Sequence, residues 1–214
     1  MREGFRMTIE IKKFVTGPIE TNTYVVINEK KACLVVDPSQ GCNQVLAFIQ
    51  EQGLALESIV LTHGHFDHIL GIAELHNAYP QMSVWMHRDD KELVTNAEYN
   101  GAYLIGSNYA FSGATYDLTE GNMRIGSFDC IVFHVPGHTP GGCALVFEDN
   151  CLSGDSLFAG SIGRTDFPGS DQESLLKNIR EKLFTLPDAT VVYPGHGART
   201  TIGREKRLNP FLHE

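Results

Sequence analysis

The chain has 214 residues, 42% of them hydrophobic, which is enough for one well-packed domain spanning residues 1–214. Its formal net charge of -9 leaves no broadly basic surface to neutralise phosphates, so we expect no nucleic-acid partner. No stretch approaches the about 20 apolar residues of a membrane span, and residues 1–10 lack the apolar core of a signal peptide, so we expect a soluble, cytoplasmic protein without a membrane partner.

The first half of the chain combines short strands with two helices. β-Branched and apolar runs bounded by turn residues predict strands, the first three as an antiparallel meander, at residues 9–15, 23–27, 32–36, 58–61 and 84–86. Apolar residues at helical spacing predict a helix over residues 43–52, with Gly53 as its C-cap. The same spacing predicts a second helix over residues 68–78, ended by Pro80.

The second half repeats this pattern with other elements. Strands are predicted at residues 130–135, 143–147, 151–153 and 190–193. Residues 171–183 predict an amphipathic helix, and residues 88–118 lack a strong period. We expect this last segment to be part helix and part loop, either over a site or as a peripheral insertion. The pattern alone predicts an α/β or α+β protein.

The five cysteines give no sign of a disulfide framework. Their number is odd, no C-x-x-C spacing occurs, and most lie in apolar runs: Cys33, Cys42, Cys130, Cys143 and Cys151. We therefore expect buried, free thiols without a nucleophilic role.

Three imidazoles and a carboxylate lie within six consecutive positions directly after the strand at residues 58–61. They are His63, His65, Asp67 and His68. Imidazole nitrogen and carboxylate oxygen suit divalent cations such as Zn²⁺, Mn²⁺ or Fe²⁺, and no cysteine lies nearby to form a sulfur-rich structural site. The spacing allows His63 and His65 to converge on one ion and directs Asp67 and His68 towards a neighbouring one. The motif therefore predicts a catalytic metal centre.

Three more metal-binding side chains follow predicted strands later in the chain. His138 lies in a turn rich in proline and glycine, and His196 follows the strand at residues 190–193. Asp155 follows the strand at residues 151–153, and a carboxylate there can bridge two cations with its two oxygens. Each alone is also typical of an ordinary loop. Their occurrence together behind the first motif favours a shared site.

The motif H-x-H-x-D-H resembles the signature of the metallo-β-lactamase superfamily. With residues 160–164 and the Asn209-Pro210-Phe211 run, the chain is similar to the glyoxalase II (hydroxyacylglutathione hydrolase) branch. The resemblance implies an α+β, four-layer αβ/βα sandwich with metals at one edge of two sheets. It implies a first metal on His63, His65 and His138, a second on Asp67, His68 and His196, and Asp155 as their bridge. The histidines that match no ligand position are His76, His87, His134 and His213.

The resemblance also implies a binuclear metallohydrolase acting on a small-molecule thioester. Two divalent ions, Zn²⁺ first with Fe or Mn as alternatives, would share a hydroxide that attacks the carbonyl, and Asp67 would be the catalytic residue that orients it. Typical glyoxalase II continues into a basic helical extension that holds glutathione, whereas this sequence stops soon after Asn209-Pro210-Phe211. Substrate contacts are therefore expected from residues 88–118, or from Arg204, Lys206 and Arg207.

Three alternatives remain open. A persulfide dioxygenase on the same fold would use one iron held by His63, His138 and Asp155, and residues 163–167 resemble a stretch of that family. A lactonase or β-lactamase-type hydrolase and a non-catalytic metal-binding module are the others. Arg164 is expected to have a structural role, pairing with a carboxylate beneath the site. The sequence leaves the oligomeric state undetermined.

Overall fold

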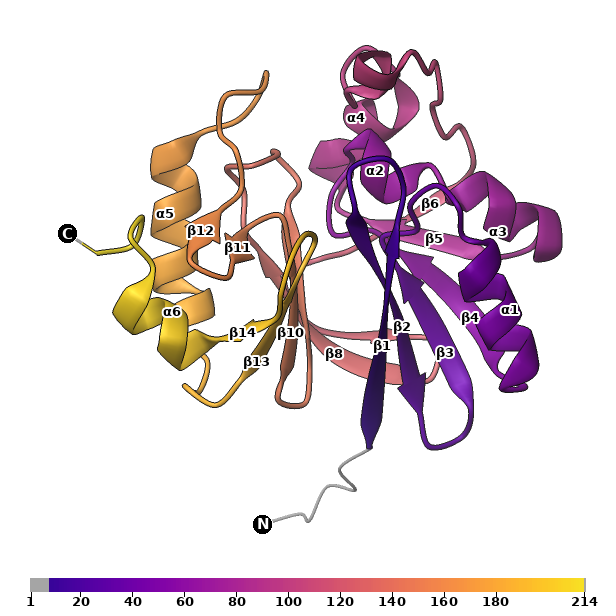
Figure 1. Cartoon of the computed structure of the whole chain (residues 1–214), viewed down its shortest axis with the longest axis horizontal. Coiled ribbons are helices and arrows are strands. Elements are labelled where there is room, and N and C mark those ends of the chain that lie inside the picture. Colours follow the sequence, from indigo (N-terminus) through magenta and orange to yellow (C-terminus); the bar gives the residue numbers. More distant parts are fainter. Residues whose placement is uncertain (1–7, 214) are drawn as a thin grey trace.

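The computed structural model describes residues 8–213 and shows two β-sheets packed face to face, with helices on both outer sides (Figure 1). The strand order is β1-β2-β3-β4-β5-β6 in the first sheet and β14-β13-β10-β9-β8-β7 in the second. Both sheets mix parallel and antiparallel pairs, and the antiparallel meander β1-β2-β3 is confirmed. The α+β, four-layer αβ/βα sandwich is therefore confirmed. The single domain over residues 1–214 stays a prediction, and residues 1–7 and 214 lie outside the described part.

The strands agree with the predicted positions to within a few residues at most ends. The first sheet contains β1 (Ile9–Thr16), β2 (Thr21–Asn28), β3 (Ala32–Val36), β4 (Ala55–Val60), β5 (Ser83–Met86) and β6 (Thr115–Asp117). The second sheet contains β7 (Gly121–Ile125), β8 (Phe128–His134), β9 (Cys143–Phe147), β10 (Asn150–Gly154), β13 (Val191–Pro194) and β14 (Thr200–Thr201). A separate hairpin is formed by β11 (Leu157–Phe158) and β12 (Ser161–Ile162). The strands that sequence analysis missed are short or polar, as in the edge strand β7.

The helices lie on the outer faces of the sheets and at the edge that carries the site. They are α1 (Asn43–Glu51), α2 (Phe66–Ile69), α3 (Ile72–Ala78), α4 (Lys91–Thr95), α5 (Gln172–Glu181) and α6 (Ile202–Leu208), with the 3₁₀ helices η1 (Arg88–Asp90), η2 (Ala102–Ile105) and η3 (Leu183–Thr185). The side chain of Asp171 caps α5 by accepting a hydrogen bond from the Ser174 amide. Residues 88–118 are part helix and part loop, as predicted, but they also contain the strand β6, which was not predicted.

One predicted helix is wrong. The helix predicted over residues 68–78 is interrupted at Leu70 and Gly71, because α2 ends at Ile69 and α3 begins at Ile72. The Gly71 amide donates to the Pro38 carbonyl at 2.8 Å, and a β-carbon at Gly71 would clash with the Ser39 carbonyl oxygen and the Cys42 thiol. This close approach of two chain segments ends α2 and starts α3. No periodicity within residues 68–78 contains that information.

The sequences of the central strands are continuous apolar runs, because both faces of each of these strands are buried. Along β3, Cys33 and Val35 pack in the cluster with α1 and α3, whereas Leu34 and Val36 pack in the cluster between the sheets. A third cluster holds the second sheet against α5 and α6. All five cysteines are free and buried, as predicted.

No helix among residues 8–213 is both long enough and apolar enough to cross a lipid bilayer. The prediction that residues 1–10 are not a signal peptide concerns mostly residues 1–7, which lie outside the described part. Within that part, the helices cover sheet faces or stand at the site edge (Figure 1).

The core between the sheets gives a direct test of this packing. Phe128 is fully buried there, with its ring 6.3 Å from that of Phe147 in an edge-to-face arrangement. We expect Phe128→Ala to lower the free energy of unfolding by about 3–5 kcal/mol, because a large buried ring leaves a cavity. Leu208→Ala, at a residue that is 64% exposed, is the control and should change it by less than about 0.5 kcal/mol. Urea denaturation measures both free energies of unfolding. Equal losses in the two variants would contradict the position of Phe128 in the core between the sheets.

Candidate metal centre

All seven predicted metal-binding side chains come together at one edge of the sandwich. The first motif follows β4, with Asp67 and His68 on the short helix α2. His138 lies between β8 and β9, Asp155 follows β10, and His196 follows β13. Each side chain therefore stands in a loop or helix that begins where a strand ends. The sheets supply the rigidity, and the loops supply the donors.

The first group of donors is a cluster of three buried histidines. One ring nitrogen of each of His63, His65 and His138 lies within 4.8 Å of the others. His65 Nδ1 is 2.9 Å from His138 Nε2. His138 Nδ1 is 2.7 Å from the Arg164 carbonyl, which can only accept, so Nδ1 carries the proton and Nε2 presents a lone pair. This group takes donors from both sheets.

The second group combines Asp67, His68 and His196, whose donor atoms also lie within 4.8 Å of one another. Asp67 Oδ2 is 3.0 Å from His68 Nε2 and 3.2 Å from His196 Nε2. It also accepts a hydrogen bond from the Thr21 hydroxyl at 2.8 Å. This group, too, joins the first sheet to the second.

Asp155 lies between the two groups. Its Oδ2 is 3.6 Å from both His138 Nε2 and His196 Nε2, and its Oδ1 is 3.5 Å from His68 Nε2. Gly195 makes this position possible, because a β-carbon there would clash with the Asp155 carboxylate. The geometry is the one expected of a bridging carboxylate, although bridging itself stays a prediction.

The electrostatics differ between the two groups. Burial, reinforced by neighbouring imidazoles, lowers the pKa of His65 to about 3 and that of His63 well below its usual range. Both rings are therefore neutral at pH 7. Burial also opposes charge on His68, but the carboxylates of Asp67, Asp155 and Asp37 outweigh it and raise the His68 pKa. The space among these carboxylates favours a cation.

Buried polar atoms without hydrogen-bond partners also support a site for two metal ions. His63 Nε2 and Asp155 Oδ1 are buried, yet they find no hydrogen-bond partner among residues 8–213. A buried polar atom without a partner costs free energy, which coordination of a cation would remove. The ligands are nitrogen and oxygen only, which matches Zn²⁺, Fe²⁺ or Mn²⁺. The buried His/Asp clusters are consistent with a dinuclear metal site.

Sequence analysis missed Asp37, which directly follows β3. Its carboxylate accepts hydrogen bonds from the Thr62 amide at 2.7 Å and the Thr62 hydroxyl at 2.6 Å, and it lies 3.0 Å from His68 Nδ1. One buried side chain thus fixes the start of the histidine loop and the orientation of His68. The available signal was an aspartate at a strand end, like Asp155.

Asp90 was also missed, and it holds the two loops of the first group together. Its carboxylate accepts hydrogen bonds from the Gly64 amide (2.9 Å), the Thr139 hydroxyl (2.7 Å) and the Gly141 amide. Burial raises the Asp90 pKa, and these three donors oppose the shift by stabilising the carboxylate. Gly64 lies between His63 and His65, so Asp90 fixes the separation of those histidines from His138.

Arg164 pairs with a carboxylate, as expected, but the pair does not lie beneath the site. Arg164 donates two hydrogen bonds to Asp166, at 2.8 and 2.9 Å, and both side chains are about two-thirds exposed at the rim of the site, not beneath it. The guanidinium carbon also lies 4.4 Å from the centre of the Phe167 ring. The pair therefore neutralises a charge at the entrance.

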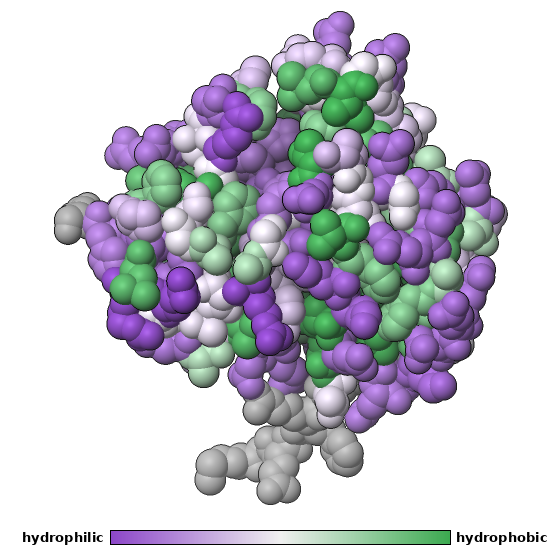
Figure 2. All heavy atoms as spheres, in the orientation of Figure 1, coloured by the Kyte–Doolittle hydropathy of each residue, from purple (hydrophilic) through white to green (hydrophobic). Residues whose placement is uncertain are grey.

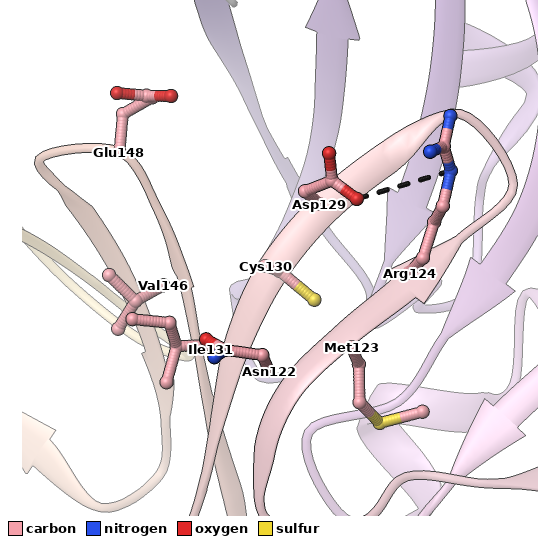
Figure 3. A pocket seen from close by; sticks show the side chains of 8 residues that line it. All are labelled: Asn122, Met123, Arg124, Asp129, Cys130, Ile131, Val146 and Glu148. Carbon is pink, nitrogen blue, oxygen red and sulfur yellow. Dashed lines mark ion pairs between the residues drawn. The ribbon is translucent and has the colours of Figure 1, made fainter. Parts of the chain in front are cut away.

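Two other features lie away from the seven residues. His87, Asp89 and His134 form a separate group of donors, but the two rings are stacked, and His134 Nε2 is already hydrogen-bonded to the Pro140 carbonyl at 2.8 Å. A cavity of about 610 Å³ lies along β7, β8 and β9 (Figure 3). An ion pair of 3.9 Å between Arg124 and Asp129 borders it, and its described lining includes none of the seven.

A sequence model of the metallo-β-lactamase superfamily matches residues 16–196, which contain every donor described above. The chain belongs to the metallo-β-lactamase superfamily. Membership accounts for the αβ/βα sandwich and for the position of the donors at its edge.

Two relatives within the superfamily align with almost the whole chain. One is the "Probable metallo-hydrolase YqgX" of Bacillus subtilis, 37% identical over 94% of this chain and 97% of the relative. The other is the "Hydroxyacylglutathione hydrolase GloC" of Haemophilus influenzae, 33% identical over 97% of this chain and 99% of the relative. The resemblance to the superfamily and to hydroxyacylglutathione hydrolase is thereby confirmed.

Two solved structures of the superfamily share the fold. The BLEG-1 B3 metallo-β-lactamase superposes with a TM-score of 0.91 and 37% identity, covering 96% of this chain and 100% of that structure. TTHA1623, in a di-iron-bound form, superposes with a TM-score of 0.85 and 36% identity, covering 94% and 100%. A protein of closely similar fold therefore holds two metal ions.

The role of Asp90 leads to a test. In Asp90→Asn, the amide group must face a donor, so at least one hydrogen bond is lost and the loops separate. We expect metal affinity to fall about 10- to 100-fold and the free energy of unfolding by about 1–3 kcal/mol. Titration of metal-free protein with Zn²⁺ measures the first. The control is Asp89→Asn, at a half-exposed neighbour; equal metal affinity in the two variants would refute the role.

Proposed function

We propose that this chain is a metal-dependent hydrolase that cleaves small-molecule thioesters at a binuclear centre. The observation that carries the proposal is the convergence of two donor groups, with Asp155 between them, beside a second cavity, of about 410 Å³, which five of the seven side chains line. When bound, two divalent cations supply Lewis acidity and an activated water for hydrolysis at neutral pH. Zinc is the first expectation, and the di-iron form of TTHA1623 supports iron as the alternative.

The chain's own residues hold the donors in place. The low pKa values of His63 and His65 keep both rings neutral at neutral pH, so that one nitrogen of each ring has a lone pair available for a metal ion. The Arg164 carbonyl holds the His138 ring so that Nε2 faces the centre. The Thr21 hydroxyl fixes the Asp67 carboxylate, to which we assign the orientation of the attacking water. Such partners preserve geometry during the reaction.

The chemistry of the leaving group supports a thioester. Hydrolysis forms a carbon–oxygen bond and breaks the carbon–sulfur bond, and the thiolate leaves with the electron pair while the proton goes to solvent. A thiolate is a good leaving group near neutral pH and needs little acid catalysis. Burial raises the pKa of all five cysteines, which argues against a cysteine nucleophile. The name of GloC gives independent support, because a hydroxyacylglutathione is a thioester.

A β-lactam is the second candidate substrate. The observation in its favour is the 37% identity to a structure named as a B3 metallo-β-lactamase. The single-iron dioxygenase uses fewer of the residues present, since the whole second group of Asp67, His68 and His196 would have no role. Both alternatives enter the experiment below.

The test joins metal content to activity. We expect about two ions per chain in unchelated protein, hydrolysis of thioesters, and a loss of at least about 100-fold in kcat/KM after chelation or in His138→Ala. The exposed His213 provides the control variant His213→Ala, which should keep full activity. Elemental analysis and a thiol-release assay measure these quantities.

Other outcomes identify the alternatives. Full thioester hydrolysis by metal-free protein would overturn the proposal. About one iron per chain, with oxygen uptake on addition of a persulfide, would point to the dioxygenase. Hydrolysis of a chromogenic cephalosporin without release of thiol from any thioester would point to the β-lactam.

A further inference from the structure

The cavity above the metal centre is apolar on the sides away from the donors. It has a volume of about 410 Å³, within the usual range for small-molecule sites, and His65, Asp67, His138, Asp155 and His196 contribute to its lining. Apolar and aromatic side chains from several segments make up much of the remainder: Ile19, Phe66, Tyr103, Leu104, Phe158 and Phe167. The first comes from the β1–β2 turn and the last from the loop before α5, so the wall is built from both halves of the sandwich.

Several of these side chains are exposed to an unusual degree for their size. Tyr103 is 60% exposed, Leu104 57% and Ile19 46%, and Tyr99 and Ile105 beside them are also exposed. Figure 2 shows apolar side chains gathered at the top of this face, over the segment that joins α4 to β6. A contiguous apolar rim around a polar floor is typical of a ligand site, because a bound apolar group removes that surface from water.

Charge is scarce in the same cavity. Beyond Asp67 and Asp155, the charged residues among its described lining are Glu98 and Arg164. Arg164 is already paired with Asp166 and packed on Phe167. Glutathione carries two carboxylates, for which this lining offers, apart from the metal centre, one neutralised cation and one repelling anion. Of the three basic residues expected to contact substrate, Lys206 and Arg207 pair with Asp188, and Arg204 lies 3.7 Å from Glu205. None of the three is among the described lining of this cavity.

We propose that the preferred substrate is a thioester with a bulky apolar acyl group, held by this apolar rim, and that recognition does not depend on an anionic thiol carrier. The inference rests on the proposed thioester hydrolysis and adds its specificity. The scissile carbonyl lies over the two donor groups, and the acyl chain extends between η2 and the β1–β2 turn. Specificity therefore comes from desolvation of the acyl group.

The experiment compares acyl groups on one neutral carrier. N-acetylcysteamine thioesters of two to eight carbons are hydrolysed by the metal-loaded protein, together with octanoyl-glutathione. Each methylene that becomes buried should raise kcat/KM roughly threefold to fourfold until the cavity is filled. With the octanoyl group fixed, glutathione and N-acetylcysteamine should give kcat/KM values within about threefold of each other, because the carrier adds little binding.

Matched variants locate the effect. Leu104→Ser should lower kcat/KM for the octanoyl substrate about threefold to tenfold and flatten its dependence on chain length. Leu208→Ser removes a similarly exposed leucine on α6, outside the cavity, and should leave that dependence unchanged. Equal behaviour of the two variants would overturn the assignment of the rim.

Binding of non-hydrolysable thioethers separates this inference from the proposed function. S-alkyl-N-acetylcysteamine thioethers should bind more tightly with each added methylene in calorimetry. Thioester hydrolysis that is independent of acyl length, or at least tenfold better on the glutathione carrier, would overturn the inference and leave the hydrolase intact. Length-dependent thioether binding without hydrolysis of any thioester would support the apolar cavity and overturn the proposed function.

Discussion

Two buried carboxylates hold the two loops that carry the histidine motif and His138. Asp37 joins the end of β3 to the start of the histidine loop, and Asp90 joins that loop to the one that carries His138. Hydrogen bonds to a carboxylate are stronger than those between neutral groups, and burial removes water as a competitor. The donors can therefore occupy fixed positions although they stand on loops and not on strands.

The metal centre contains many buried polar atoms because they face two shared volumes that could each hold a cation. A protein interior normally pairs each such atom, and here several converge on two small volumes instead. Neutral imidazoles dominate one volume and carboxylates face the other, so the two volumes differ in charge, and Asp155 lies between them. The metal-binding side chains and the apolar rim therefore line the same cavity.

The site was more predictable from sequence than some parts of the fold. His63, His65, Asp67 and His68 lie within six positions, so their chemistry is visible without any tertiary information. Asp90 is invisible by the same approach, because its partners Gly64 and Gly141 are 26 and 51 positions away and bind through backbone atoms. The break between α2 and α3 likewise depends on a distant loop. The apolar rim is formed by segments from both halves of the chain, and no local sequence pattern predicts that they lie side by side.

Each donor group takes residues from both sheets, and this has a consequence beyond the reaction. An ion bound at either position would link the end of β4 to the end of β8 or β13, in addition to the core between the sheets and the backbone hydrogen bond from Cys143 to Thr62. Opening of this edge would then require release of the ion. A protein of this design would survive proteases longer where its metal is plentiful, because binding to the folded state alone lowers the population of open forms. Loss of the metal would thus shorten the lifetime of the folded protein as well as stop its catalysis.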